Sequence, residues 1–321
     1  MFQYFIKRLL ALLPKLLAIV IIVFFAMELM PGNAVTRTLG VEAMEMMTPE
    51  QIQMQIEAKG LDKPAYIRFF YWFADLCRGD LGYSLSGGAP VASLLKQRLP
   101  ATMILALCGL LLSTVFGILF GVIASVKKNT PIDYGMTVAG LVGISIPQFF
   151  FCLLFMLVFA INLKWLPVGG RVSIEDTSVF GYIKHLILPA TCLAINHIAA
   201  MQRYTRNSML DVMGKDYIKT ARAKGLKEHV VYMKHCFRNG CAPVVTLLIG
   251  RLGILVSGTT IIESVFNYPG MGTLFLSALN TKDTPVAMVI LMLTSMAVLV
   301  TTFLADIALA ALDPRIRFGK E

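Results

Sequence analysis

Charged residues are scarce in this chain: they make up 15% of its 321 residues, whereas 57% are hydrophobic. Ordinary soluble domains carry about 25% charged and 45–50% apolar residues. The composition excludes a disordered chain and argues against a soluble enzyme. There are only six cysteines and four histidines. Because they show neither a C-x-x-C pair nor a metal-ligand spacing, we expect no disulfide framework and no metal site.

Catalytic and nucleotide-binding motifs are also missing. The sequence has no G-x-x-x-x-G-K-[ST], no H-E-x-x-H and no G-x-S-x-G, so we expect no P-loop, no catalytic residues and no cofactor bound by this chain. The net charge is +10, but the basic residues flank hydrophobic blocks, which indicates membrane topology rather than nucleic-acid binding. We interpret the chain as a conduit or anchor, not as an enzyme.

Six hydrophobic blocks are long enough to cross a bilayer, which takes about 20 mostly apolar residues. They span residues 9–30, 101–126, 134–163, 183–203, 242–262 and 286–309. No cleavage site follows the first block, so we expect a retained anchor. Pro147 predicts a kink in the third block, and Gly117 with Gly121 predicts close helix packing in the second. The sequence thus predicts an all-α integral membrane protein with six transmembrane helices.

Lysine and arginine gather in alternate connecting segments, as in cytoplasmic loops. Residues 203–238 carry nine basic and three acidic residues, whereas residues 31–98 carry seven of each. We therefore expect both termini to be cytoplasmic. The predicted parts are an N-terminal transmembrane helix (1–30), an extracytoplasmic segment (31–98), a five-helix core (99–312) with a cytoplasmic loop at 204–241, and a cytoplasmic tail (313–321).

The extracytoplasmic segment is predicted to hold two short helices. Thr48, Pro49 and Gln51 form a capping-box start for the first. The second follows Asp62, and its residues expected on one apolar face are Ile67, Phe70, Tyr71, Ala74 and Cys77. Two such helices predict a small folded layer, which is either a lid or docking platform over a pore or merely connecting structure.

Two short helices are also expected in the cytoplasmic loop, and we call residues 216–238 the knuckle. Asp216 is expected to cap a helix over residues 217–224, and Gly225 to end it, because glycine tolerates the left-handed conformation. A second helix is expected over residues 228–238. Tyr217, Thr220 and Ala221 are spaced to share a face on which a partner docks. The alternative is a basic loop without a partner.

The knuckle sequence DYIKTARAKGL, residues 216–226, resembles the coupling loop of permease subunits in the dipeptide, oligopeptide and nickel branch of binding-protein-dependent ABC importers. The usual E-A-A triplet is replaced by Lys219, Thr220 and Ala221. Four other stretches carry the same resemblance: RGDLGYS (78–84), LPVGGR (166–171), ESVFNYPGMG (263–272) and DPRIR (313–317). The opening through Met30-Pro31-Gly32 is similar to that of the first of the two permease subunits.

The resemblance implies the six-helix fold of an importer permease in the inner membrane of a bacterial or archaeal cell. It implies pairing with a second homologous permease, two cytoplasmic P-loop ATPase subunits that bind ATP and Mg²⁺, and an extracytoplasmic solute-binding protein. The residues implied to couple to the ATPases are Asp216, Tyr217, Thr220, Ala221, Arg222, Ala223, Lys224, Gly225 and Leu226. Those implied to form an external gate, or else a structural turn, are Glu263, Phe266, Pro269 and Gly270.

Polar residues within the predicted spans are candidates for the translocation pathway. Arg251 lies well inside its predicted span, a depth at which an ionisable residue is costly and commonly functional. We expect it to face the pathway and attract the C-terminal carboxylate of a peptide; the alternatives are an internal ion pair or a snorkelling side chain. Gln148 and Asn196 either line a wet cavity or hydrogen-bond between helices.

The sequence therefore predicts the permease subunit of an ABC importer for dipeptides or oligopeptides. The same role for nickel or another metal chelate is an alternative, because specificity mostly resides in the separate binding protein. A stand-alone secondary transporter or channel is a second alternative, although no internal repeat of the kind such transporters show is evident. A membrane scaffold is a third.

Overall fold

The computed structural model of the protein describes residues 2–29, 35, 39, 44–59, 62–173 and 176–312. Its helices are α1 (Phe2–Glu28), α4 (Pro49–Lys59), α5 (Ala65–Cys77), α6 (Val91–Val126), α7 (Pro131–Ser145), α8 (Gln148–Phe155), the π-helix η1 (Met156–Asn162), α9 (Val179–Met213), α10 (Asp216–Ala223), α11 (Glu228–Val230), the π-helix η2 (Val231–Phe237), α12 (Arg238–Gly240), α13 (Ala242–Val265), α14 (Met271–Asn280) and α15 (Thr284–Leu312). The described residues contain no strand, only an isolated bridge between Tyr83 and Pro90. The predicted all-α class is confirmed. The predicted tail at 313–321 and the Met30-Pro31-Gly32 stretch lie outside the described residues.

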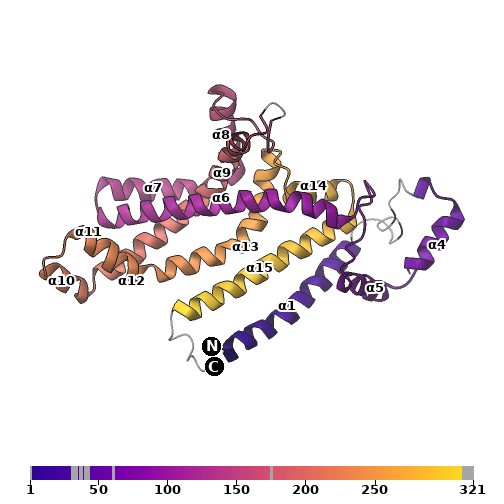
Figure 1. Cartoon of the computed structure of the whole chain (residues 1–321), viewed down its shortest axis with the longest axis horizontal. Helices are drawn as coiled ribbons and strands as arrows, with labels where there is room; N and C mark the ends of the chain where they lie inside the picture. The colour runs from indigo at the N-terminus through magenta and orange to yellow at the C-terminus, as the bar shows by residue number, and fades with distance from the viewer. Residues whose placement is uncertain are drawn as a thin grey trace.

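The long helices run along one axis of the molecule (Figure 1). The short helices α10, α11 and α12 gather at one end of this axis, and α4 and α5 lie at the other (Figure 1). Helix α1 packs beside α15 and runs antiparallel to it. Residue 2 and residue 312 therefore lie toward the same end of this helix pair.

Four helical stretches are long and apolar enough to cross a membrane: Leu10–Glu28, Val91–Val126, Val179–Met213 and Thr284–Ile307. A bent pair, Pro131–Ser145 with Gln148–Asn162, makes up to five. Helix α13 covers the predicted fifth block, but it passes through residues 252–258, whose side chains the structure leaves undescribed. A membrane protein with several spanning helices is confirmed, and the count of six stays a prediction.

The third hydrophobic block is broken rather than gently kinked at Pro147. Its two halves meet at an angle of 102°. Ile146 adopts an extended conformation with φ −83° and ψ 129°, as expected of a residue that precedes proline. Pro147 has no backbone N–H to continue the helix, and it becomes the N-cap of α8. The sequence located the disturbance correctly but underestimated its size.

Helices α6 and α9 pack closely through glycines, as the small-residue pattern predicted. A Cβ atom on Gly117 would lie 2.5 Å from the Met201 Cβ, and one on Gly121 would lie 2.5 Å from the Thr205 Cβ. Neighbouring helices gain no hydrophobic driving force from contact inside lipid, so their stability depends on such close approach. This contact fixes α9, from which the knuckle extends.

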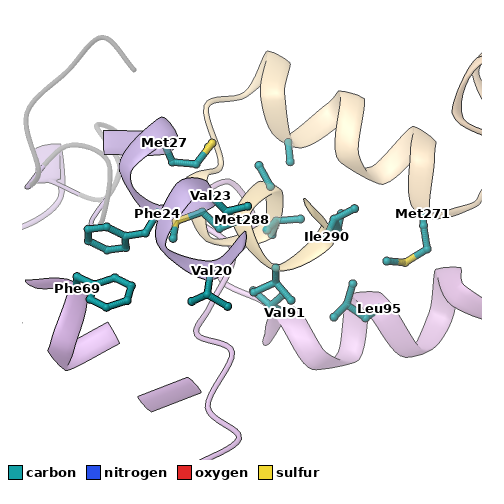
Figure 2. Packing of buried hydrophobic residues seen from close by; sticks show 14 residues of the cluster. Val20, Val23, Phe24, Met27, Phe69, Val91, Leu95, Met271, Met288 and Ile290 are labelled. Atoms are coloured by element: carbon teal, nitrogen blue, oxygen red, sulfur yellow. The ribbon is translucent and has the colours of Figure 1, made fainter. Parts of the chain in front are cut away.

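An apolar cluster joins α1 to the rest of the molecule. Val20, Val23, Phe24 and Met27 of α1 point toward residues of α5, α6, α14 and α15 (Figure 2). Phe24 meets Phe69 of α5 with ring centroids 5.4 Å apart in an edge-to-face arrangement, which adds a specific attraction to the packing. The segment that was predicted to be extracytoplasmic is therefore attached to the long helices by α5.

The first outer helix begins as the sequence predicted. The Thr48 backbone N–H donates to the Gln51 side chain at 2.9 Å, and the Gln51 N–H donates to the Thr48 hydroxyl at 3.3 Å. This reciprocal pair is a capping box. The predicted start of α4 is confirmed.

The predicted apolar face of the second outer helix is wrong. Phe70 and Tyr71 are exposed, whereas Phe69 is buried and Trp72 and Phe73 pack against the same cluster. Residues 69–73 of α5 are all aromatic and therefore occur on every side of the helix, so periodicity alone did not identify the buried face. The neighbour that decided between them is α1, which lies far away in the sequence.

Candidate functional site

Helix α10 of the knuckle has one buried face. Ile218 is fully buried and Ala221 is 7% exposed, and both pack in a cluster with Met209 of α9 and with Val231 and Cys236 of η2. The second half of the knuckle is a continuous helical run whose middle is a π-helix. The knuckle is therefore a small folded unit with its own apolar core, attached to the end of α9.

The end of α10 agrees with the sequence prediction. Gly225 has φ +75°, the left-handed conformation that glycine adopts without strain. Its N–H donates to the Arg222 carbonyl at 2.9 Å, and the Leu226 N–H donates to the Ala221 carbonyl at 3.4 Å. These two bonds form a Schellman motif, which stops α10 at a fixed position.

The start of α10 differs from the prediction. Lys215 is the N-cap residue, and Asp216 lies inside the first turn rather than capping it. The Asp216 carboxylate instead accepts a hydrogen bond from the Lys219 ammonium at 2.8 Å. A carboxylate in a first turn still interacts favourably with the positive end of the helix dipole. Helix α10 therefore begins one residue earlier than predicted.

An ion pair closes the turn between the two halves of the knuckle. Arg222 donates to Glu228 from Nε at 3.0 Å and from Nη2 at 3.4 Å. Hydrogen bonds from Arg222 and then from Tyr232 hold the pKa of the Glu228 carboxyl below its ordinary value. The Arg222 guanidinium also lies over the Tyr232 ring, 5.9 Å from its centroid. The turn is thus held by a bidentate pair in addition to its backbone bonds.

The predicted docking face is only partly correct. Tyr217 and Thr220 are exposed, but Ala221 is buried together with Ile218. Alanine is small and apolar, so it suits the inner seam of α10 as well as it would suit a partner. The residues of the predicted coupling set that are exposed are Asp216, Tyr217, Thr220, Arg222, Ala223, Lys224, Gly225 and Leu226.

A buried ion pair supports the helix that carries the knuckle, and sequence reasoning missed it. Arg206 of α9 donates to Asp133 of α7 from Nε at 2.6 Å and from Nη2 at 2.7 Å. The Asn129 N–H also donates to Asp133 at 3.0 Å. In the sequence, Arg206 is only one of the basic residues of the predicted cytoplasmic loop. Nothing there links it to a residue 73 positions earlier. The pair holds α7 against α9 just before the knuckle.

The three predicted pathway residues lie along residues 192–197 of α9. Arg251 of α13 donates from Nη1 to Nδ1 of His197, and the Gln148 side chain donates to the Cys192 carbonyl at 3.5 Å. Asn196 lies between these two positions, and its Oδ1 is buried without a partner among the described residues. The structure thus supports interhelical hydrogen bonding for Gln148 and identifies His197 as the neighbour of Arg251.

The predicted gate residues form a rigid turn between α13 and α14. Glu263 is fully buried and accepts hydrogen bonds from the Thr102 hydroxyl at 2.6 Å and from the Gly272 N–H at 2.7 Å. The carboxylate therefore caps the N-terminus of α14. Phe266 is buried in the apolar cluster between α6 and α9, and Pro269 is half-buried. A Cβ on Gly270 would lie 2.3 Å from the Glu263 carboxyl, so any larger residue would displace that carboxyl from its hydrogen bonds.

A loop between η1 and α9 packs against the turn between α13 and α14. The Gly170 N–H donates to the Phe266 carbonyl at 2.8 Å, and His185 hydrogen-bonds the Gly169 carbonyl at 2.8 Å. A Cβ on Gly169 would lie 2.3 Å from the Phe266 carbonyl oxygen. The sequence stretches 166–171 and 263–272 are therefore neighbours in space. Their glycines serve close backbone approach.

A second contact between loops joins segments far apart in the sequence. Asp283, which is 2% exposed, accepts hydrogen bonds from the hydroxyls of Ser84 and Ser86. Ser84 belongs to the RGDLGYS stretch, and Asp283 precedes the first residue of α15. The Asp-Thr-Pro sequence is a helix-start signal, which could have located Asp283 but not its serine partners.

No group of three or more histidine, cysteine, aspartate or glutamate side chains suited to a metal ion occurs among the described residues. The electrostatic features of the site are the ion pairs and the buried carboxylates described above. Their arrangement can hold helices in place and transmit a displacement.

Two family descriptions match the chain. Residues 117–318 match the binding-protein-dependent transport system inner membrane component. Residues 1–106 match the N-terminal part of the corresponding membrane component. Together the two matches cover nearly the whole sequence.

Relatives with similar sequences carry permease names. The chain is 38% identical to the oligopeptide transport system permease protein AppB of Bacillus subtilis over 324 residues, which cover 99% of this chain and 100% of that protein. It is 39% identical to a protein of Brucella suis biovar 1 named as a peptide permease, over 99% of each chain. It is 36% identical to the glutathione transport system permease protein GsiC of Escherichia coli O6:H1, over 99% of this chain and all of that protein.

A solved structure shares the fold at low sequence identity. A chain of the methionine ABC transporter MetNI in an inward-facing conformation superposes with a TM-score of 0.56 and 15% identity. The superposition covers 70% of this chain and 98% of that chain. At this identity the likeness concerns the fold alone.

Proposed function

The chain belongs to the family of binding-protein-dependent transport system inner membrane components, and we propose that it forms half of the translocation pathway of an ABC importer for peptides. It is a multi-pass membrane permease subunit. The peptide substrate is supported by relatives named for peptide, oligopeptide and glutathione transport. A second homologous permease would form the other half of the pathway.

The knuckle is the observation that carries the proposal. It projects from the end of α9 and has its own apolar core, a Schellman stop at Gly225 and an ion pair across its turn. A rigid short helix transmits a displacement, whereas a floppy loop does not. Two cytoplasmic P-loop ATPase subunits would bind ATP and Mg²⁺, and the exposed side of α10 would dock on one of them. Closure of the ATPases would then move α9.

The outer turn would serve as an external gate. Glu263 joins Thr102 of α6 to the first turn of α14, so movement of α13 relative to α6 would carry this turn with it. Phe266 and Gly270 would act as fixed packing points of the gate. An extracytoplasmic solute-binding protein would deliver the solute at this side.

The proposed orientation places both termini and the knuckle in the cytoplasm. It is supported by the antiparallel packing of α1 and α15 (Figure 1) and by the nine basic residues against three acidic ones in 203–238. The cell membrane of a bacterium or archaeon would be the location. Nickel or another metal chelate is a second candidate solute, because specificity would reside in the binding protein.

The test is purification of the tagged chain from its own host in mild detergent, with mass spectrometry of the proteins that accompany it. Co-purification of a second permease and of one or two P-loop ATPases supports the proposal. Uptake of labelled peptide by vesicles carrying this complex should then require ATP and the binding protein.

Purification of a monodisperse chain without partners would contradict the proposal. It would favour the stand-alone transporter, for which uptake would follow an ion gradient and ignore ATP. Uptake of a metal chelate but of no peptide by the intact complex would leave the importer architecture and change the substrate.

A further inference from the structure

Arg251 is the one basic residue in the sequence of α13. It lies nine residues after the first residue of the helix, Ala242, and fourteen before the last, Val265. At 1.5 Å per residue it is about 14 Å from the start of the helix. A cation at such a depth is costly unless an anion or a hydrogen-bonding group compensates it.

The described residues do not supply that anion. Arg251 donates from Nη1 to Nδ1 of His197, and a histidine nitrogen that accepts a hydrogen bond carries no proton of its own. Among the described part of the chain, Arg251 forms no ion pair with a carboxylate. Its Nε is buried and has no partner there. The positive charge therefore lies beside a neutral acceptor only.

Two other arginines of the chain show what the edge of a guanidinium formed by Nε and Nη2 binds. Arg206 and Arg222 each hold a carboxylate with Nε and Nη2 together. That fork is the geometry by which arginine recognises a planar carboxylate. In Arg251 the histidine occupies Nη1, on the opposite side, and Nε of the carboxylate-binding edge is the atom without a partner.

Space and a second polar group are present nearby. The side chains of residues 245–251 are all half-buried, and a Cβ on Gly250 would meet nothing within 4 Å. The described residues therefore leave space beside α13 at Gly250, the residue next to Arg251. Asn196 precedes His197, and its side-chain Oδ1 is buried without a partner among the described residues. A buried polar atom that makes no hydrogen bond is unfavourable.

We propose that Arg251, positioned by His197 and with Asn196 beside it, is a binding site for a free carboxylate of the solute, the C-terminal carboxylate of a peptide. The proposal rests on the function proposed above and specifies the chemistry that its pathway selects. His197 is a positioning residue: it fixes the guanidinium through Nη1 and leaves the Nε edge for the solute. Asn196 supplies an acceptor for an N–H of the same peptide.

The experiment uses the whole complex with its binding protein in proteoliposomes. ATP-driven uptake is measured for a peptide with a free C-terminal carboxylate and for the same peptide amidated, each at a concentration that fully loads the binding protein. R251Q should slow uptake of the carboxylate form about tenfold, as expected for loss of one charged hydrogen bond, and leave the amide form within twofold of wild type. R251K, which keeps the charge without the fork, should be intermediate.

A second measurement needs only the carboxylate peptide. R251C vesicles are treated with a cationic or an anionic methanethiosulfonate reagent, and wild-type vesicles treated in the same way control for native cysteines. Uptake should recover with the cationic reagent and not with the anionic one. Equal recovery with both, or none with either, overturns the site.

The other outcomes are equally decisive. If R251Q slows both peptides equally, Arg251 compensates a carboxylate of another subunit and selects nothing. If it slows neither, Arg251 has no role in transport. Wild-type vesicles that take up neither peptide with ATP contradict the proposed function and this site with it, whereas normal wild-type uptake with an unaffected R251Q contradicts the site alone.

Discussion

Arg222 and Glu228 face each other across the turn of the knuckle, with the guanidinium Nε 3.0 Å from one carboxylate oxygen. The pair joins the last turn of α10 to the first residue of α11, over the exposed surface of the molecule. Exposed ion pairs contribute little to stability. This one has a different consequence, because it fixes the angle at which α10 meets the rest of the knuckle.

Exchanging the two charges tests this role. R222E and E228R should each lower the ATP hydrolysis that the loaded binding protein stimulates in the reconstituted complex, because like charges push the turn open. The double variant R222E/E228R should recover most of it. A double variant no better than either single one would show that the pair does not act as a unit.

Acid should loosen the same turn. The pKa of Glu228 lies below its ordinary value of 4.5, so the pair stabilises the folded knuckle above that value and the contribution is lost as the pH falls through the lowered pKa. Amide exchange over residues 216–230, corrected for intrinsic rates, should quicken between pH 6 and pH 3.5. In E228Q the corrected rates should change little over this range. An equal acid response in E228Q would assign the effect to other groups.

Removing Asp133 should destabilise the helix bundle. Its side chain is 2% exposed and that of Arg206 is 22% exposed, and breaking a buried pair from one side costs about 3–5 kcal/mol. D133A should therefore lower the thermal unfolding temperature of the purified complex by several degrees. D75A is the matched control, because its pair with Arg78 is exposed on both sides; it should leave the temperature unchanged. Equal effects of the two changes would refute the argument from burial.

Gly270 and Gly250 should respond in opposite ways to the same substitution. A Cβ at position 270 would lie 2.3 Å from the Glu263 carboxyl, whereas one at position 250 meets nothing within 4 Å. G270A should cost about 1–3 kcal/mol of stability through crowding. G250A should be neutral or stabilising, since alanine is the better helix former. Thermal unfolding of the two variants in detergent gives the comparison, and a stable G270A would mean that the turn yields easily.

Local features of the fold were predictable from the sequence. Gly225 ends α10 and Thr48 begins α4 as predicted, because caps depend on a few neighbouring residues. The hydrophobic blocks located the long helices, and Pro147 marked the break in the third. The size of that break, 102°, depends on what α8 packs against and was not evident from the proline.

Long-range relationships were not predictable. The buried face of α5 is set by Phe24 of α1, and periodicity could not choose it. Ala221 was assigned to a docking surface but packs inward, since a small apolar residue suits both places. Arg206 with Asp133, and Ser84 with Asp283, join positions separated by 73 and 199 residues, and a single sequence carries no record of such pairs. The exposed residues of the coupling set stay a prediction.

The most direct test of the account is a photo-cross-link from the exposed side of α10. Benzoylphenylalanine placed at Tyr217, which is 47% exposed, should form an adduct with a P-loop ATPase when the assembled complex is irradiated. The same probe at Val179, 77% exposed at the other end of α9, should form none. An adduct at position 217 that changes in yield when ATP is added is the result we expect. No ATPase adduct at 217 from an assembled complex would contradict the docking of α10.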